Sequence, residues 1–369
     1  MSGERTHDAL VLVDTRTPYE VRKFPTVAPK GDEILINMKW TASTPLDLHQ
    51  ADGALLIEHP TRVGSAGAGV VVEVGPDVKH FQVGDRVFGF APPLKPEWRT
   101  RQEYCTVPEW TYGKIPDRIS FEEAATLPDN LVTAFNTISA DLKLPTPWPK
   151  PADYSPPRAN ERVLVWGAAS SVGQLTIQVL AYYGYKRIVA TASAQHHAHI
   201  RDLGASEVYD YRSASVVEDL LDGAAARGGG EEAAFPLIVD CIGSVAGSLT
   251  PISKLAQSGS TVAVMLPVIV KHASKETAPE YSMDPGASVA WAPGVAVSGV
   301  RTHFYYKNEM FREKLSTEII PTLLEQGIVR PNRYRVIEGE TLLERAKKAL
   351  DIIRDGVSGE KLVWRVSNE

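Results

Sequence analysis

The chain has 369 residues, two cysteines and a formal net charge of −6 at pH 7, and 43% of its residues are hydrophobic. This length and apolar content predict two domains with large cores, and the negative charge excludes a general nucleic-acid binder. No run of about 18 apolar residues is present to span a membrane, and no signal-peptide pattern stands at the N-terminus. Because two cysteines cannot form a disulfide framework, we expect a cytoplasmic protein with two buried thiols.

Short strands separated by turns are expected over the first part of the chain. Residues 8–14 and 33–38 are apolar runs typical of strands, with proline and glycine between them. Residues 68–75 form a β-branched run that ends in a Gly-Pro-Asp turn, and residues 83–89 place a tight Gly-Asp turn before another strand. This pattern predicts a small all-β or barrel-like domain.

A glycine-rich turn then joins an apolar run to a helical pattern. Val163–Val165 is typical of a buried parallel strand, and only small residues lie between Gly167 and Gly173 apart from Val172. Residues 174–183 carry the apolar spacing of a helix that stops at Gly184. The helix N-terminus favours a pyrophosphate, although the pattern also suits a tight turn in any α/β protein.

Strands and helices alternate after this turn. We expect strands at 187–193, 207–211, 237–243 and 261–265 and a helix at 197–203. The alternation predicts a doubly wound parallel sheet with right-handed crossovers. Further helices and a last strand are expected near the C-terminus, at 315–326, 341–354 and 361–366.

Five stretches follow one another in an order that is typical of one superfamily. They are Val71–Gly89, Phe121–Phe135, Gly167–Gly173, Leu203–Ala205 and Ser358–Val363. Together they resemble the motifs of the medium-chain dehydrogenase/reductase superfamily, over essentially the whole chain. Within it, the chain is similar to the zinc-free quinone and enoyl reductases, and above all to fungal trans-acting enoyl reductases of polyketide biosynthesis.

The resemblance implies a discontinuous α/β architecture. A doubly wound parallel-sheet (Rossmann) cofactor domain would be inserted into a GroES-like β-barrel catalytic domain. We place the first part of the catalytic domain at 1–130, the cofactor domain at 131–301 and the C-terminal completion of the catalytic domain at 302–369. The protein would be a monomer or a homodimer.

The positions that hold zinc in other members of the superfamily carry no ligands here. By resemblance, these positions fall in Ala42–Asp47, which has no Cys, and at Gly64-Ser65-Ala66. Ser and Ala are not zinc ligands, and two cysteines cannot fill a four-Cys site. We interpret the neighbouring His196, His197 and His199 as a solvated helix start rather than a metal site, so no metal is predicted.

Without a Lewis acid, hydride transfer to an activated C=C bond suits the chain better than alcohol chemistry. We therefore predict an NADPH-dependent, zinc-independent reductase of enoyl thioesters or enones. The substrate would be a small molecule or bound to a carrier, with a polyketide synthase as the candidate partner. Two alternatives stay open: a quinone oxidoreductase, and a catalytically silent nucleotide-binding partner protein.

The cofactor phosphates are expected on the glycine-rich turn, where small side chains leave the backbone open. The predicted contacts there are Gly167, Ala169, Ser170, Ser171, Val172 and Gly173. NADPH is favoured over NADH because Ser193, not a carboxylate, ends the second strand. His197 lies four residues further on, and Tyr211 is expected to end the next strand, where the family often directs a tyrosine hydroxyl at the 2′-phosphate.

The resemblance also assigns residues around the nicotinamide. Asn130 and Thr133 would border the ring, although a helical Thr can instead bond its own backbone. Lys361 would reach a cofactor phosphate, with a solvated lysine as the alternative. The remaining contacts would be Cys241, Ile242, Gly243, Leu266 and Pro267.

The proton donor is the least defined assignment. In the fungal enoyl reductases, a Lys follows two residues after the segment that matches Pro45-Leu46-Asp47, and this chain has His49 there. By resemblance, Pro45 and Asp47 belong to the cofactor site, and a structural hydrogen-bonding role for Asp47 is favoured over an acid. A histidine can donate a proton near neutral pH, so His49 is the catalytic candidate with Thr133 beside it, against the alternative of a packing or surface His.

Overall fold

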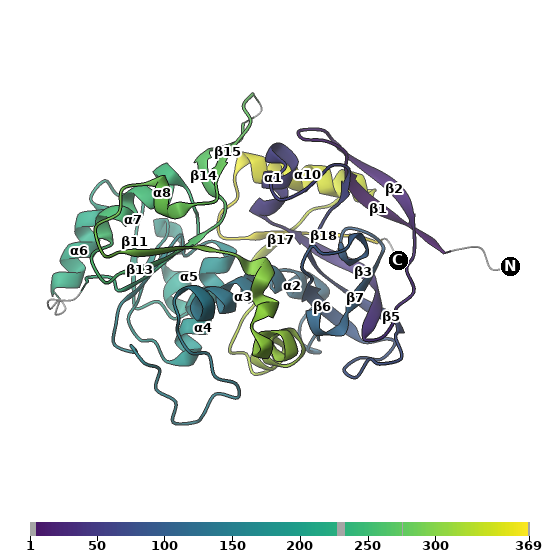
Figure 1. Ribbon diagram of the computed structural model, residues 1–369, viewed down its shortest axis with the longest axis horizontal. Helices are drawn as coiled ribbons and strands as arrows, with labels where there is room; N and C mark the ends of the chain where they lie inside the picture. The colour runs from purple at the N-terminus through teal and green to yellow at the C-terminus, as the bar shows by residue number, and fades with distance from the viewer. Residues whose placement is uncertain (1–4, 227–232, 275, 368–369) are drawn as a thin grey trace. The chain divides into compact units, whose positions relative to one another are not determined.

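The computed structural model describes residues 5–226, 233–274 and 276–367. The chain forms two compact units, which Figure 1 shows with their helices and strands labelled. The first unit comprises residues Met1–Val132, Ala273–Ala278 and His303–Glu369, and the second comprises Thr133–His272 and Pro279–Thr302. The domain boundaries placed at 130/131 and 301/302 stay a prediction.

The first unit is built mainly from antiparallel strands. Its large sheet has the order β17-β18-β3-β5-β6-β8, with β7 paired to β3, and a small sheet has the order β2-β1-β4. The strands of the two sheets are β1 (Thr6–Leu12), β2 (Tyr19–Pro25), β3 (Glu33–Ser43), β4 (Thr61–Arg62), β5 (Ala66–Val74), β6 (Arg86–Phe90), β7 (Tyr104–Pro108), β8 (Tyr112–Lys114), β17 (Tyr334–Val336) and β18 (Lys361–Arg365).

The two ends of the chain meet in this sheet. The last strand, β18, pairs antiparallel with β3, so that Leu362 lies opposite Ser43 and Arg365 opposite Trp40. The apolar side chains of these strands share one core with the amphipathic C-terminal helix. The helices of the unit are α1 (Pro45–Gly53), α2 (Phe121–Ala125), α9 (Ile320–Glu325) and α10 (Leu342–Asp355), with a π-helical segment at Phe311–Ile319.

The second unit is a doubly wound parallel sheet. Its strand order is β11-β10-β9-β12-β13-β16, and every neighbouring pair is parallel. The strands β9, β10 and β12 are buried over their whole length, as expected where helices cover both faces. The elements of the sheet are β9 (Val163–Trp166), β10 (Ile188–Thr191), β11 (Glu207–Tyr209), β12 (Leu237–Asp240), β13 (Thr261–Met265) and β16 (Ala296–Val300).

Helices connect these strands, and a small hairpin lies outside the sheet. The strand order places β9 between β10 and β12, so the chain changes direction beside β9, where such sheets bind nucleotides. The other elements are α4 (Ser171–Tyr183), α5 (His197–Asp202), α6 (Val216–Ala226), α7 (Thr250–Leu255), β14 (Val268–Lys271), β15 (Glu280–Ser282) and α8 (Pro285–Ser288). Helix α3 (Pro128–Asn136) contains the boundary between the units.

The predicted GroES-like and Rossmann architecture is confirmed, with four local corrections. The strand expected at 237–243 ends at Asp240, because Gly243 takes a positive φ of 62° that extended backbone cannot continue. The strand expected at 207–211 ends at Tyr209. Strand β2 was not predicted, since prolines flank it, yet an edge strand tolerates a proline at its end. The helix expected at 315–326 begins earlier, at Phe311, in the π-helical segment.

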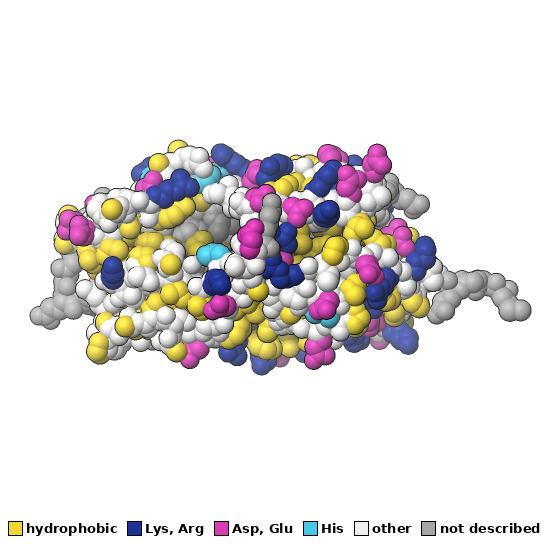
Figure 2. Space-filling view, turned by 90° about the horizontal axis from the view of Figure 1, so that it is seen from above, with side chains coloured by type: hydrophobic (Ala, Val, Ile, Leu, Met, Phe, Trp, Pro, Cys, Tyr) yellow, Lys and Arg dark blue, Asp and Glu magenta, His cyan; other side chains and the backbone are white. Residues whose placement is uncertain are grey.

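Charged side chains of both signs are interspersed on the face that Figure 2 shows, with no broad area of one sign. Both cysteines, Cys105 and Cys241, are free and buried, as predicted. Within the described ranges, no helix has the length and apolar character needed to cross a bilayer.

Candidate functional site

The glycine-rich turn between β9 and α4 has the backbone that a dinucleotide phosphate needs. Gly167 leaves the strand with a φ of 78°, which favours glycine. A Cβ on Gly173 would lie 2.7 Å from Gly167 O and 2.8 Å from Ala168 Cα, so only glycine lets α4 begin this close to the strand. Ser170 caps the helix by accepting a hydrogen bond from Gly173 N at 3.1 Å. The turn therefore fits a pyrophosphate at the N-terminus of α4.

Neighbouring elements hold this turn in place. Thr191, at the end of β10, accepts from Gly167 N through its side chain and from Ala168 N through its carbonyl, at 3.1 and 2.8 Å. From inside α4, Gln174 Nε2 donates to Ala169 O at 2.9 Å. The predicted contacts Ala169, Ser170, Ser171 and Val172 thus lie on a fixed loop, which costs little entropy to order when a ligand binds.

Two of the residues expected near the cofactor ribose follow β10, which ends at Thr191 and not at Ser193 as expected. Ser193 is 2% exposed and precedes a short 3₁₀ turn with no hydrogen bond from its side chain to cap it. His197 Nε2 lies 2.9 Å from Ala192 O, and because a carbonyl only accepts, Nε2 carries a proton. Only Nδ1 of His197 is then left for a ligand, and it donates only when the ring is protonated at both nitrogens.

Tyr211 lies in a turn two residues beyond β11, so the expectation that it ends the strand is wrong. Its ring is 40% exposed, since a strand end in solvent gives it no core to enter. In the parallel pairing Thr191 lies opposite Tyr209, which brings the residues that follow, Ser193 and Tyr211, to the same edge of the sheet.

Arg212 is a residue that the sequence prediction missed. Its guanidinium lies 5.6 Å from the centre of the Tyr211 ring and is exposed. Nothing in the local sequence marks Arg212, because it is the parallel register of β10 and β11 that makes the end of the next strand a neighbour of Ser193 in space. An Arg-Tyr pair at this edge suits a phosphate.

The loop after β12 is shaped by a buried carboxylate. Asp240 Oδ1 accepts from Ile242 N at 2.9 Å and Gly243 N at 3.1 Å, and its Oδ2 accepts from Ser248 Oγ at 2.7 Å. Burial raises the pKa of Asp240 to about 6, against the three hydrogen bonds, which favour its charged form. The loop that the sequence assigned to the nicotinamide is therefore held by Asp240.

The assigned residues of this loop differ in exposure. Cys241 is buried, and burial raises the pKa of its thiol, so the group behaves as a small apolar side chain. Ile242 is 39% exposed and lies over Gly167, where an added Cβ would meet its side chain. Leu266 and Pro267 follow the adjacent strand β13, at the same edge of the sheet.

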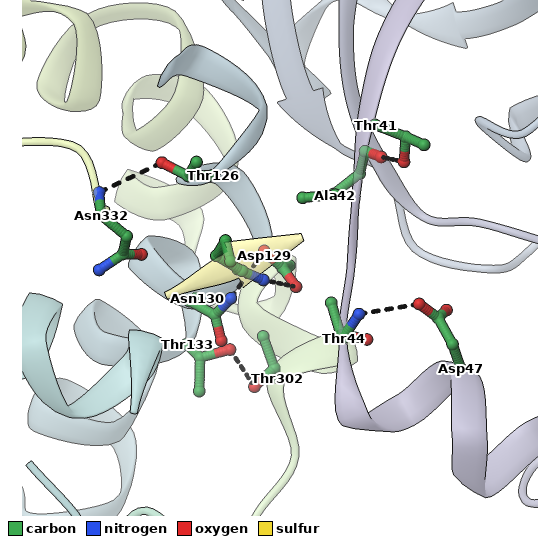
Figure 3. Close-up of polar contacts among 12 residues, drawn as sticks. Thr41, Ala42, Thr44, Asp47, Thr126, Asp129, Asn130, Thr133, Thr302 and Asn332 are labelled. Carbon is green, nitrogen blue, oxygen red and sulfur yellow. Dashed lines mark hydrogen bonds and ion pairs between the residues drawn. The ribbon is translucent and has the colours of Figure 1, made fainter. Parts of the chain in front are cut away.

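Thr133 bonds to a residue from the far end of the same unit. Thr302 Oγ1 lies 2.9 Å from Thr133 Oγ1 (Figure 3). Thr137 Oγ1 donates to Thr133 O at 2.8 Å. The hydroxyl of Thr133 is thus part of a polar contact with another hydroxyl.

In the first unit, Asp129 brings two assigned residues together. Asn130 Nδ2 donates to Asp129 Oδ1 at 2.9 Å (Figure 3), and Lys361 Nζ lies 3.5 Å from Asp129 Oδ2. The Lys361 side chain is 5% exposed, so the alternative of a solvated lysine is wrong: β18 is a central strand, and its first side chain points into the protein. Asp129 itself was missed, because nothing in its local sequence marks it as the partner of Lys361.

Helix α1 carries Pro45, Asp47 and His49. Pro45 takes the first helical position, where its missing N–H is tolerated, and Asp47 accepts from Thr44 N at 2.8 Å (Figure 3). Arg101 donates to Asp47 Oδ2, and both side chains are buried. Burial alone would lower the pKa of Arg101, yet Asp47 raises it above its ordinary value. These contacts are those of a structural carboxylate, while His49 lies half-buried on the same helix.

The positions matched to zinc ligands carry backbone roles instead. Gly64 takes a φ of 91° and its carbonyl accepts from Thr100 N, while Ala66 begins β5. His197 begins helix α5, as the helix start was expected, but His197 and His199 are half-buried and hydrogen-bonded rather than fully solvated: His199 Nε2 lies 3.1 Å from Gln174 Oε1. Across the described part of the chain, no group of three or more His, Cys, Asp or Glu side chains could hold a metal ion.

Comparisons with known proteins agree with this geometry. A model of the alcohol dehydrogenase GroES-like domain matches residues 30–135. A trans-enoyl reductase of Aspergillus japonicus is 31% identical over 345 residues, 91% of this chain and 90% of that protein. The enoyl reductase component of the lovastatin nonaketide synthase of Aspergillus terreus is 29% identical over 314 residues, 82% of this chain and 81% of that protein.

Solved structures share the fold over nearly the whole chain. The quinone oxidoreductase of Escherichia coli, complexed with NADPH, gives a TM-score of 0.71 at 18% identity, over 98% of this chain and 100% of that one. A putative zinc-dependent alcohol dehydrogenase of Rhizobium etli gives 0.74 at 20% identity, over 98% of each chain. At such identities the likeness shows the fold alone.

The class is therefore a GroES-like β domain combined with a Rossmann nucleotide-binding sheet. The chain belongs to the medium-chain dehydrogenase/reductase superfamily, and it is an oxidoreductase.

Proposed function

We propose that this protein is an NADPH-dependent, zinc-independent reductase of activated C=C bonds in enoyl thioesters or enones. The observation that carries the proposal is the similarity, over about nine tenths of both chains, to a trans-enoyl reductase. The two units supply what such a reaction needs: a fixed phosphate turn in the second unit and a buried polar cluster in the first. A carrier-bound substrate of a polyketide synthase is the natural candidate, as the name of the lovastatin relative suggests.

The glycine-rich turn and the strand ends would hold the cofactor. Gly167 to Gly173 would take the pyrophosphate, and the loop Cys241–Gly243 with Leu266 and Pro267 would border the nicotinamide. When bound, the reduced nicotinamide supplies a hydride. The protein's own contribution would be to orient the ring, exclude water and present the substrate.

The edge formed by Ser193 and Tyr211 supports NADPH over NADH. An acidic residue at the end of the second strand would bind the ribose hydroxyls and repel a 2′-phosphate, and Ser193 stands there instead. Tyr211 can donate a hydrogen bond and Arg212 a charge-assisted one. One such bond to an ionised group is worth roughly 1.5–3 kcal/mol, enough for at least about tenfold preference.

In the first unit, the proposed roles fall on Asn130, Lys361 and His49. Asn130 and Lys361 share the carboxylate of Asp129, which fixes the two side chains relative to each other. His49 would donate the proton that the α-carbon of the substrate takes up. Asp47 would keep α1 in place through Arg101 rather than act as an acid.

The test is reduction of a set of acceptors by the purified protein. A crotonyl thioester of N-acetylcysteamine, cyclohexenone and a benzoquinone are each offered with NADPH and with NADH. We expect kcat/KM to be highest for the thioester and at least about tenfold higher with NADPH. Ser193→Asp should abolish or reverse the cofactor preference. The matched control for an added charge is Ser258→Asp, at an exposed serine in the loop before β13.

Two outcomes would replace the proposal. Turnover of the quinone alone would favour a quinone oxidoreductase. This chain shares its fold with the quinone oxidoreductase of Escherichia coli. Cofactor binding without turnover of any acceptor, carrier-bound thioesters included, would favour a catalytically silent partner protein. Equal kcat/KM for both cofactors would refute the roles given to Ser193, His197 and Tyr211.

A further inference from the structure

A half-buried arginine of the first unit has no partner in the part of the chain that the structure describes. Arg99 follows a 3₁₀ turn at Pro96–Trp98, and neither an ion pair nor a hydrogen bond is made by its guanidinium. Its backbone is nevertheless fixed, because Arg99 N donates to Pro96 O and Gln102 Nε2 donates to Arg99 O at 2.7 Å. The Arg99 side chain therefore extends from a fixed backbone, and its guanidinium N–H groups have no partner among the described residues.

The other arginines that are buried or half-buried show what a structural arginine looks like in this protein. Arg101, two residues further on, reaches Asp47 and the carbonyl of Ala42 and lies over the Trp364 ring. Each of the rest likewise gives at least one hydrogen bond to a described carbonyl, amide or carboxylate, namely Arg62, Arg86, Arg162, Arg187, Arg345 and Arg354. Arg99 is the exception among the described residues, and a cation half removed from water without an anion is costly.

His303 is a second donor beside Arg99. Its ring packs against Phe90, with 5.6 Å between the ring centroids, and within the described ranges its nitrogens have no hydrogen-bond partner. Backbone pairing brings the two residues together, because Thr100 N donates to Gly64 O and Ala66, two residues further on, pairs with Phe90, on which His303 packs. Burial lowers the pKa of His303, and the positive charge of Arg99 lowers it further. His303 is thus mainly neutral at pH 7 and offers one N–H.

The charges around the pair favour an anion. Burial lowers the pKa of Arg99 to about 10, and the positive charge of Arg62 nearby contributes to the shift. The acid that acts on His303 is Asp129, which is already bound to Asn130 and paired with Lys361. His303 follows Thr302, whose hydroxyl lies 2.9 Å from that of Thr133, one helical turn beyond Asp129 and Asn130 in α3. The pair therefore lies near the assigned residues Asn130 and Lys361.

We propose that Arg99 and His303 form an oxyanion site that holds the carbonyl oxygen of the substrate and stabilises the enolate formed during reduction. This rests on the proposed enoyl reductase function. The β-carbon takes the hydride, the C=C pair moves to join the α-carbon to the carbonyl carbon, and the carbonyl pair moves to oxygen. The enolate oxygen then carries the negative charge that Arg99 and His303 meet. The α-carbon takes a proton, the carbonyl re-forms, and the nicotinamide is left oxidised.

In this chain, which has no zinc ligands at the matched positions, the two side chains would take over the stabilisation of the carbonyl oxygen that a Lewis acid provides elsewhere. Donors aimed at a developing oxyanion act most strongly when they are fixed in advance and partly shielded from water. Arg99 meets both conditions, since its backbone is held on both sides and its side chain is half-buried.

The experiment compares Arg99→Gln, Arg99→Lys and His303→Asn with a control, Arg312→Gln. Arg312 is exposed in the same unit, with its guanidinium 5.8 Å from the centre of the Trp110 ring. Two readouts are used for each variant. The first is kcat/KM for the crotonyl thioester, and the second is the affinity of crotonate and of neutral crotonamide for the protein without cofactor, measured by NMR titration.

We expect Arg99→Gln to lower kcat/KM about 100-fold, as loss of one oxyanion donor does elsewhere, mostly through kcat. The wild type and Arg312→Gln should bind crotonate at least tenfold more tightly than crotonamide, and Arg99→Gln should lose that preference. Arg99→Lys should keep part of both effects. If Arg99→Gln does not fold, judged by its melting temperature, the Lys and His303→Asn variants carry the comparison.

The oxyanion site is overturned if Arg99→Gln, or the folded Lys and Asn variants, stay within about twofold of the wild type in both readouts. It is also overturned if the wild type binds crotonate no better than crotonamide. A wild type that reduces no enoyl acceptor but prefers crotonate would refute the enolate role and the proposed function together, and leave an anion site of another purpose.

Discussion

His49 and Asp47 leave the same helix two residues apart, and their surroundings separate their roles. Asp47 is buried against Arg101, whereas His49 is half-buried. The Asp47 carboxylate is bound to Arg101 and to the backbone of Thr44, so it is not available for proton transfer. Asp52, the other carboxylate of α1, pairs with Arg354. We therefore assign proton transfer to His49.

We predict that His49→Ala lowers kcat for an enoyl thioester at least tenfold, because a positioned general acid contributes about 10²–10⁴-fold. His80→Ala, an exposed histidine of the same unit, is the control and should leave kcat unchanged. Steady-state kinetics and cofactor titration measure both variants. Values within about twofold of the wild type for turnover and affinity would make His49 a bystander.

Asp240 gives the second prediction at the level of single residues. Its pKa is raised from 3.8 to about 6 in the folded protein, so folding favours the protonated form. The resulting stabilisation is complete below pH 3.8 and is lost as the pH rises through about 6, by about 3 kcal/mol for two pKa units. Asp240→Asn keeps an acceptor for Ile242 N and Gly243 N but cannot ionise.

The measurement is urea unfolding of the wild type and Asp240→Asn at several pH values between 4.5 and 7.5. The difference in unfolding free energy should move in favour of the variant as the pH rises from 4.5 to about 6, and should level off above that pH. A difference that stays constant across this range would contradict the raised pKa.

At the level of elements, the turn between β9 and α4 depends on contact of backbone with backbone. A Cβ at Gly173 would meet Gly167 O and Ala168, neither of which can move without shifting β9 or the helix start. The same close contact at Gly173 therefore shapes the turn that would hold the phosphates and allows α4 to pack on the sheet.

We predict that Gly173→Ala weakens cofactor binding at least tenfold and destabilises the protein by about 1–3 kcal/mol, the usual cost of overpacking. Gly286→Ala is the matched control, because in α8 of the same unit an added Cβ would meet only the carboxylate of Asp284. Fluorescence titration with NADPH and thermal unfolding test both. Unchanged affinity in Gly173→Ala would show that the phosphates bind elsewhere.

At the level of the whole molecule, the question is whether the chain needs a metal. Its two cysteines lie in different units, Cys105 in β7 and Cys241 after β12, and both are free and buried. Ser65 and Ala66 stand where a ligand would be required, and neither side chain binds zinc.

We predict that the purified protein contains well under one zinc per chain and keeps its activity in a chelator. Elemental analysis by mass spectrometry and an activity assay after treatment with EDTA decide this. Near-stoichiometric zinc together with activity lost to the chelator, and restored by zinc, would overturn the zinc-independent mechanism.

The sequence by itself determined the order of the sheet-forming segments and the class of fold. Apolar runs such as Val163–Val165 specify buried strands, and Gly167 and Gly173 specify the turn, because these signals are local and need no partner. The family motifs, which follow one another from Val71 to Val363, then assigned each segment to one of the two domains. The small residues of the phosphate turn could be named for the same reason.

Only the tertiary structure decided which side chains share an environment. Lys361 and Asp129 are 232 positions apart and form an ion pair, and Arg212 reaches the Ser193 edge only through the parallel register of β10 and β11. Arg99 and Arg101 look alike in sequence, yet Arg101 pairs with Asp47 while Arg99 has no anionic partner among the described residues. Partners of this kind come from strands and loops distant along the chain, so hydrophobic period and local motif carry no record of them.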